Sequence, residues 1–337
     1  YLISRFLYFS TIDQDDIKEV VFITAQDSKA YLNILRYDPT INLLNRLPKI
    51  EIDTISYYNG KPDVANNSIF SHQSEIYFDL TAGYSIQPRK IYKYNVSNGS
   101  VIKTGLNSFT IPQMEHKVFN GQGFILAKEN IATSNTASHE DLEWLKNSKD
   151  PDTLKIYESV KHLEYEYGDF SSYILLYTDS LNFAFEPIEF FGWTNYTKSE
   201  FINIEGKPHI IALTNTIKGD STSKLITLCD LQGTIEKQIS LAHNYTDIFT
   251  EGNKIVFKDN NTLYKYSNNL EIMSQIPNIT HCEGFIDING DQESELIAFR
   301  DNEMIIISPN FDILATFKIN QEFAPYPEDN GIHLLQI

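Results

Sequence analysis

A short acidic stretch, FIDINGDQESELIAF, holds the side chains best suited to chemistry in this sequence. Asp287, Asn289 and Asp291 stand at alternate positions, which puts three side-chain oxygens on one side of a tight loop. Glu295 adds a fourth just before an apolar run. Calcium takes six to eight oxygen ligands at about 2.3–2.6 Å, and the backbone carbonyl of Glu293 with water can complete such a shell. Because carboxylates this close repel one another without a cation, the stretch predicts a calcium site.

This loop is not an EF-hand, because its sixth position is Gln292 rather than Gly and a strand is expected to follow it instead of a helix. It resembles the calcium loop of FG-GAP or VCBS repeats, which form the blades of integrin α-type propellers. In those repeats, Asp-x-Asp/Asn-x-Asp leads to an acidic residue and an apolar strand. Here Asp287, Asn289, Asp291 and Glu295 occupy the four positions, whereas Gln292 replaces the Gly common after the third ligand.

Two further loops resemble this one less closely. Near the start of the chain, Asp13, Asp15 and Glu19 align with the last three ligands of the acidic loop, but Thr11 replaces the first Asp. They predict a second, weaker metal site. A third copy, NIEGKPH, is shorter and ends in His209, so we expect a metal-free turn there. The alternative for all three loops is a solvated polar turn that does not respond to chelators.

The rest of the chain is organised as a repeat. Period-2 alternation of β-branched and aromatic residues dominates between Asn, Asp, Gly and Pro clusters, which is typical of short antiparallel strands. A polar loop and strand are followed by a hairpin at intervals of about 40–50 residues, the sequence form of a propeller blade. The recurring hairpins lie at 31–44, 91–102, 172–185, 224–239, 262–273 and 304–317.

Six complete units and a partial seventh at 328–337 predict an all-β fold, a single β-propeller domain over residues 1–337. Seven blades are expected, with six as the alternative. The apolar segment YLISRFLYF at the start is a candidate to complete the last blade, because such closure removes an exposed sheet edge.

One segment breaks the repeat. Within residues 138–168, Asp150 before Pro151 is typical of a helix N-cap followed by its first residue, and Ser138 with Asp141 resembles a capping box. We expect a helical insertion at about 138–163 in the third blade. It serves either as a lid on the propeller or as a surface for a partner, since insertions in repeat arrays lie on one face.

Composition limits the classes of partner. The net charge of −18 argues against nucleic acid or an anionic membrane surface, which bind through clustered Lys and Arg. No apolar run approaches the roughly 18 residues of a membrane-spanning helix, so this region is not expected to insert into a membrane. Because the chain begins at Tyr1 rather than Met, we expect a piece of a longer protein. Cys229 and Cys282 are expected to be buried thiols.

No sequence pattern predicts catalysis. We find no convincing nucleophile motif, Walker loop or dinucleotide fingerprint, so no catalytic residue and no cofactor other than structural calcium is predicted. The aromatic stretch FAFEPIEFFGWTNY is most simply core, although Trp193 and Tyr196 are candidates for contact with a ligand.

With its acidic loop and repeats, the chain resembles the extracytoplasmic sensor region of a bacterial membrane receptor such as a two-component histidine kinase. The resemblance implies a non-enzymatic module for signal transduction, periplasmic or at the cell surface and membrane-anchored in the full-length protein. Its ligand would be a small molecule, a glycan or a protein, and a homodimer is one option. The alternatives are a secreted carbohydrate-binding or adhesion propeller, and a propeller polysaccharide lyase or hydrolase with charged groups of perturbed pKa in its funnel.

Overall fold

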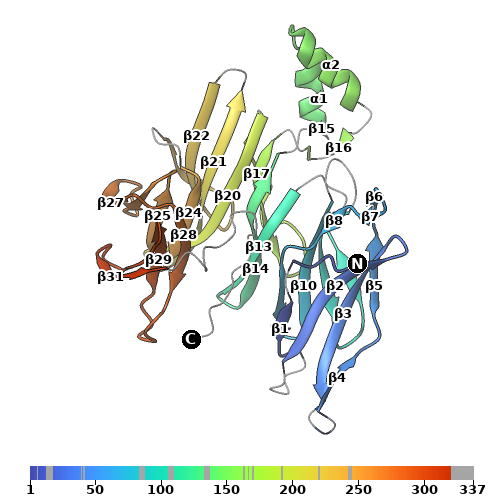
Figure 1. Ribbon diagram of the computed structural model, residues 1–337. Coiled ribbons are helices and arrows are strands. Elements are labelled where there is room, and N and C mark those ends of the chain that lie inside the picture. The colour runs from blue at the N-terminus through green and yellow to red at the C-terminus, as the bar shows by residue number, and fades with distance from the viewer. Residues whose placement is uncertain are drawn as a thin grey trace. The chain divides into compact units, whose positions relative to one another are not determined.

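The computed structural model describes most of the chain as two compact units, each considered by itself (Figure 1). The first comprises Tyr1–Ser199 and Ala212–Ser240, and the second comprises Glu200–Ile211 and Leu241–Ile337. The described residues are 1–319 apart from 6, 13–17, 39, 41, 83–87, 105–109, 133–136, 162–163, 166, 169–170, 191–192, 219–220 and 242–244.

The first unit begins with two antiparallel sheets that follow chain order. The first has the order β1-β2-β3-β4, with β5 paired to β3, and the second has the order β12-β11-β10-β8, with β9 paired to β10. A two-stranded hairpin of β6 and β7 lies between them in sequence. The strands are β1 (Tyr8–Ser10), β2 (Glu19–Gln26), β3 (Lys29–Asp38), β4 (Leu43–Arg46), β5 (Ile50–Thr54), β6 (Tyr57–Tyr58), β7 (Lys61–Pro62), β8 (Val64–Ala65), β9 (Ile69–His72), β10 (Glu75–Ala82), β11 (Arg89–Asn95) and β12 (Val101–Lys103).

The third sheet is larger. Its order is β13-β14-β20-β21-β22-β23, and β18 also pairs with β14. Between β14 and β17 lie the pair β15–β16 and the helices α1 and α2, which stand together in Figure 1. These elements are β13 (Thr110–Phe119), β14 (Gln122–Ile131), β15 (Ala137–Ser138), α1 (His139–Lys146), α2 (Pro151–Val160), β16 (Glu164–Tyr165), β17 (Ser172–Ile174), β18 (Leu176–Thr178), β19 (Ile188–Phe190), β20 (Trp193–Ile204), β21 (Lys207–Lys218), β22 (Ser221–Asp230) and β23 (Ile235–Ser240).

The second unit contains two four-stranded antiparallel sheets, each in simple chain order. The end of β20, the start of β21 and the turn between them belong to the same unit, and Asn203 of β20 donates its N–H to the Gly252 carbonyl at 2.7 Å. The strands are β24 (Asp247–Glu251), β25 (Lys254–Lys258), β26 (Thr262–Tyr266), β27 (Ile272–Pro277), β28 (His281–Ile286), β29 (Glu295–Arg300), β30 (Glu303–Ile307) and β31 (Ile313–Lys318).

Burial follows strand position within each sheet. The inner strand β10 is buried on both faces over most of its length, as expected for its sequence EIYFDLTA, whereas the outer strands β4 and β23 are largely exposed. Hydrophobic side chains of the first and second sheets form one core, those of the second and third form another, and the last two sheets share a third. Sheets of this kind bury their faces only against their neighbours, which is the property of propeller blades.

The predicted fold class is confirmed: the chain is an all-β protein built from blade-type sheets. The helical insertion is confirmed as α1 and α2, where Asp150 caps α2 by accepting the Thr153 N–H and Pro151 begins the helix. Cys229 and Cys282 are buried, and burial raises the pKa of each thiol to about 12. The blade number and the single-domain organisation stay predictions, and residues 328–337 lie outside the described residues.

The N-terminal segment runs beside the first sheet. Leu2 bridges Thr24, Ser4 bridges Asn66, and β1 pairs with β2. Its expected completion of the last blade stays a prediction. Of the two described helices, neither is long and apolar enough to cross a membrane.

Candidate functional site

The predicted calcium loop is an ordered turn stabilised by its own acidic side chains. The Asp287 carboxylate accepts the N–H groups of Gly290 and Gln292 at 2.7 and 2.9 Å. Asn289 Oδ1 accepts the Asp291 N–H at 2.9 Å, and Asp291 Oδ1 in turn accepts the N–H of the residue two positions on. These hydrogen bonds hold the three side chains against the backbone of residues 290–293. Their oxygens are the donor type that calcium prefers.

Glu295, the last predicted ligand, is the first residue of β29 and is only 5% exposed. Its Oε2 accepts the Ile288 N–H at 3.2 Å, which fixes the carboxylate against the start of the loop. Glu293 supplies its N–H to Asp291 at 2.8 Å. All five predicted ligands therefore lie within residues 287–295. No three of their four carboxylates bring oxygens within 4.8 Å of one another, so calcium binding at this loop stays a prediction.

The first acidic loop is described only at its ends. Asp13 and Asp15 lie outside the described residues. Glu19 begins β2, is fully buried, and accepts the Ile12 N–H at 2.9 Å through Oε2. Its Oε1 accepts from Arg36 Nε at 3.2 Å. A metal ion at this loop stays a prediction.

The predicted aromatic contacts lie on one strand. Trp193 is the first residue of β20, and Tyr196 lies three residues further on, half-buried, with Lys198 Nζ 5.5 Å from its ring centroid. Their contact with a ligand stays a prediction. His209, which replaces the closing carboxylate in the third loop, is buried in β21 and its Nδ1 lies 2.9 Å from the Lys207 carbonyl.

The first unit contains a cavity of about 460 Å³ that sequence reasoning did not locate. Three segments line it: the N-terminal segment, the loop that leads into β9, and the middle of β13. The lining is rich in uncharged polar and aromatic side chains, and it includes one carboxylate, Glu115, whose Oε2 is buried without a hydrogen-bond partner. The lining residues are Leu7, Tyr8, Asn66, Asn67, Ser68, Ile69, Phe70, Ser71, Gln113, Met114, Glu115 and His116.

Asp79 on β10 anchors one wall of this cavity. Its Oδ1 accepts the N–H groups of Asn67 and Ser68 at 2.9 and 2.6 Å, and its Oδ2 accepts from Asn67 Nδ2 and from the Thr81 hydroxyl. Ser68 Oγ then accepts the Met114 N–H at 2.9 Å, which ties this wall to β13. Burial raises the pKa of Asp79 to about 6, although the hydrogen bonds that it accepts favour ionisation.

Beside the cavity, three side chains of types that bind metal ions lie close together. Among the described residues, His72, His116 and Asp179 form the one group of three or more His, Cys, Asp or Glu whose donor atoms all lie within 4.8 Å of one another. His116 Nε2 lies 2.9 Å from Asp179 Oδ1, and the rings of the two histidines are 4.7 Å apart. His116 also lines the cavity, so the cavity and the cluster share one side chain.

The surroundings hold these side chains in place. His116 stacks on Phe70 at 5.3 Å, and Phe70 stacks on Tyr77 at 5.1 Å. Gly123 on β14 leaves room for the Asp179 carboxylate, because a Cβ at this position would overlap it. Burial lowers the pKa of His116 even though Asp179 acts in the opposite direction, so its imidazole is mainly neutral at pH 7.

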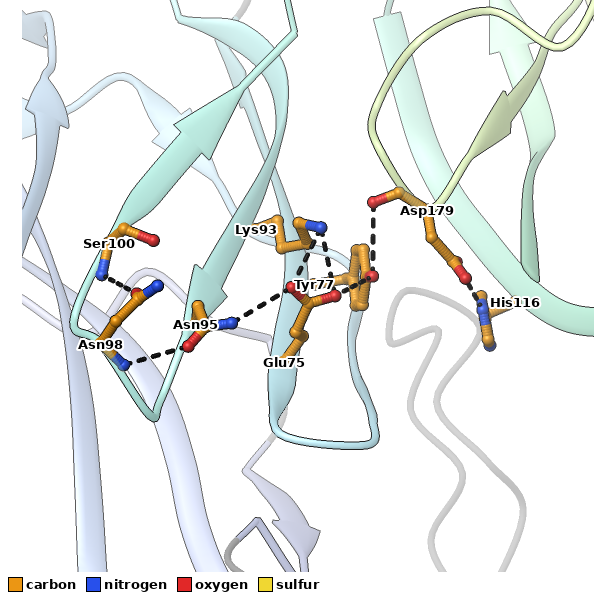
Figure 2. A network of polar contacts seen from close by, with 8 residues as sticks. All are labelled: Glu75, Tyr77, Lys93, Asn95, Asn98, Ser100, His116 and Asp179. Atoms are coloured by element: carbon orange, nitrogen blue, oxygen red, sulfur yellow. Dashed lines mark hydrogen bonds and ion pairs between the residues drawn. The ribbon is translucent and has the colours of Figure 1, made fainter. Parts of the chain in front are cut away.

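A polar network extends from this cluster across β10 and β11 (Figure 2). The Tyr77 hydroxyl donates to Glu75 at 2.7 Å and lies 3.4 Å from the Asp179 carbonyl oxygen. Lys93 pairs with Glu75 at 3.0 Å, and Asn95 donates to the same carboxylate at 3.4 Å. Burial alone would raise the pKa of Glu75, but these hydrogen bonds and the lysine charge lower it overall. Glu75 is therefore an ionised anchor for the tyrosine.

Local sequence patterns could not reveal this cluster. His116 and Asp179 are 63 residues apart, and each of the three side chains comes from a different element: the end of β9, the middle of β13 and the turn after β18. Their proximity depends on how the second and third sheets pack. Gly123, which precedes the apolar run FILA in β14, is the one local signal, since Gly in a strand can mark a close approach.

Comparison with known proteins leaves the family of the chain open. No family model matches it, and no curated protein matches it. It is similar to solved structures of BBS1N in complex with ARL6DN (TM-score 0.48, 10% identity, 94% of this chain and 82% of that chain). It is also similar to the dihydro-heme d1 dehydrogenase NirN (TM-score 0.43, 9% identity, 93% and 73%) and to BamB from Moraxella catarrhalis (TM-score 0.39, 8% identity, 94% and 85%).

Proposed function

We propose that this chain is a non-enzymatic recognition module that binds a polar ligand in the cavity of the first unit. The polar lining of the cavity supports this function, because Asn67, Ser71 and Gln113 offer side-chain groups that can hydrogen-bond a bound molecule. A ligand with hydroxyl or amide groups, such as a glycan or a peptide, matches that lining. Tyr8 and Phe70 offer apolar faces to the same ligand.

We also propose that the acidic loop before β29 binds calcium as a structural ion and belongs to the FG-GAP or VCBS type. The ordered turn formed by Asp287, Asn289 and Asp291, together with the buried Glu295, supports this assignment. The ion would fix the entrance of one blade-type sheet. It would contribute stability rather than chemistry.

At the level of the whole protein, we propose an extracytoplasmic sensor region of a signalling receptor, anchored in the membrane by segments beyond this chain. The net charge of −18 agrees with a ligand other than nucleic acid. Reading the complete gene product tests this directly. A membrane-spanning segment followed by a kinase module is the expected result, and a complete product without either would rule out the sensor assignment.

Ligand binding is tested by a thermal-shift screen of the chain against neutral oligosaccharides and short peptides. Gln113 is exposed and lines the cavity, so Gln113→Ala should weaken the response to any hit without affecting the fold. Gln122 is exposed at the start of β14 and does not line the cavity, which makes Gln122→Ala the matched control. Glu115→Gln should also change the preference among hits, because the amide offers donors that the carboxylate lacks. If a hit shifts the melting temperature of all three variants equally, its binding site lies elsewhere.

A further inference from the structure

We propose that His72, His116 and Asp179 form a zinc site in the first unit. Two imidazole nitrogens and one carboxylate oxygen are a donor set that zinc favours. The three donor atoms already lie within 4.8 Å of one another. This site differs in kind from the acidic loop of the second unit, where every predicted ligand atom is an oxygen and calcium is the expected ion.

The geometry of the cluster is close to that of a metal shell. Bonds of about 2.0–2.1 Å in a tetrahedral zinc site separate neighbouring ligand atoms by about 3.4 Å. His116 Nε2 and Asp179 Oδ1 are 2.9 Å apart, and small side-chain rotations would bring the three atoms to a common centre. The His116 side chain is 10% exposed and the Asp179 side chain is 31% exposed, so an ion can reach them from solvent.

The scaffold around the cluster also favours binding. His116 is held by stacking on Phe70, and Gly123 leaves space for the carboxylate of Asp179. Ligands that are already positioned lose little side-chain entropy when an ion binds. Because the ligands come from β9, β13 and the turn after β18, the ion would join the second sheet to the third.

Three protein ligands leave one position of a tetrahedral shell for water or another ligand. His116 is shared with the cavity, so the ion would lie next to the cavity contents. Zinc would thus both stabilise the wall formed by β13 and influence which ligands bind beside it. The competing interpretation is a plain His–Asp hydrogen bond that requires no ion.

Zinc titration of the metal-free chain, in calcium sufficient to saturate the acidic loop, distinguishes these interpretations. We expect one zinc ion per chain, measured by elemental analysis after gel filtration, and a visible spectrum typical of four or five ligands when cobalt replaces zinc. His72→Ala, His116→Ala and Asp179→Asn should each weaken zinc by at least about 100-fold, beyond the 10- to 100-fold cost of losing an outer-shell partner.

The chain offers a matched control. His281 and Glu283 form another His–carboxylate pair at 3.0 Å, without a third ligand, on the exposed strand β28. His281→Ala should leave zinc binding unchanged. Equal zinc binding by His281→Ala and the three cluster variants would overturn the proposal, as would a wild-type chain that binds no zinc.

A further variant tests the site without removing a ligand. Gly123→Ala places a methyl group where the Asp179 carboxylate lies, and the carboxylate can rotate away without movement of the backbone. We expect the variant to keep the melting temperature of the metal-free wild type and to lose most of its zinc affinity. If Gly123→Ala binds zinc as tightly as the wild type while the three ligand variants do not, Asp179 binds the ion from another position and the proposed geometry is wrong.

Discussion

The strands β2 and β29 begin in the same way, in different units of the chain. In each, a buried glutamate begins the strand and its Oε2 accepts the N–H of the residue seven positions earlier: Glu19 from Ile12 at 2.9 Å, and Glu295 from Ile288 at 3.2 Å. The shared contact agrees with the sequence alignment of the two loops.

The loops differ in what neutralises the glutamate. The register Val20–Leu35 puts Arg36 opposite Glu19, and its Nε reaches Oε1 at 3.2 Å. The register Leu296–Ile307 puts Ser308 at the equivalent position, and none of the ion pairs found among the described residues involves Glu295. A guanidinium therefore supplies the positive charge in the first loop. In the last loop, we propose that calcium supplies it.

Asp79 is a third buried carboxylate, and neither an arginine nor a proposed ion neutralises its charge. Four donors from Asn67, Ser68 and Thr81 surround its carboxylate, and burial still raises its pKa to about 6. Without a full positive charge nearby, hydrogen bonds alone do not compensate for desolvation. The comparison shows that these buried carboxylates differ in their partners: Glu19 contacts a guanidinium, whereas Asp79 is surrounded by uncharged donors.

The largest expected effect is the pH dependence caused by Asp79. Because its folded pKa lies above the ordinary value of 3.8, its contribution favours the folded state below pH 3.8, declines as the pH rises, and is lost above about pH 6. The difference between these two pKa values corresponds to about 3 kcal/mol in the free energy of unfolding. Urea unfolding at pH 4 and pH 7 should show most of this difference, about 2 kcal/mol, in the wild type but not in Asp79→Asn, in which the other titratable groups are unchanged. Equal pH dependence in both proteins would mean that folding leaves the pKa of Asp79 unchanged.

The next effect comes from removing the charge of Glu19. Glu19→Gln removes the buried charge that Arg36 Nε contacts at 3.2 Å, and we expect a loss of about 1–3 kcal/mol in the free energy of unfolding. The loss should be the same with calcium and with chelator, because the arginine supplies the local charge. As a control, Glu51→Gln breaks an exposed pair with Lys29 at 2.7 Å and should have a much smaller effect on stability than Glu19→Gln. If calcium changed the cost of Glu19→Gln, a metal ion at the first loop would follow.

The smallest effect is expected from adding an arginine opposite Glu295, at the position that Arg36 has opposite Glu19. Ser308→Arg places a guanidinium opposite Glu295 and should stabilise the calcium-free chain by about 1 kcal/mol while weakening its response to calcium. Ser308→Gln, similar in length but uncharged, is the control. Identical behaviour of these two variants in chelator would break the comparison, because charge would then not distinguish the loops.

The sequence predicted the features that depend on local patterns. Strand alternation, the recurring hairpins and the Asp150–Pro151 helix start gave the all-β fold and the helical insertion, because these signals act over a few residues. The pairing of Arg36 with Glu19 was missed, since it depends on strand register. The cavity and the cluster of His72, His116 and Asp179 were missed for a similar reason: they arise where neighbouring sheets pack, at separations that no local pattern records.

Calcium titration of the chelator-treated chain tests the central claim most directly. We predict one calcium ion per chain in the wild type and in Glu19→Gln, and none in Asp291→Ala, which removes one loop oxygen ligand and the acceptor for the Glu293 N–H. A wild-type chain that binds no calcium, or an Asp291→Ala variant that binds it as tightly as the wild type, would contradict a cation at the last loop.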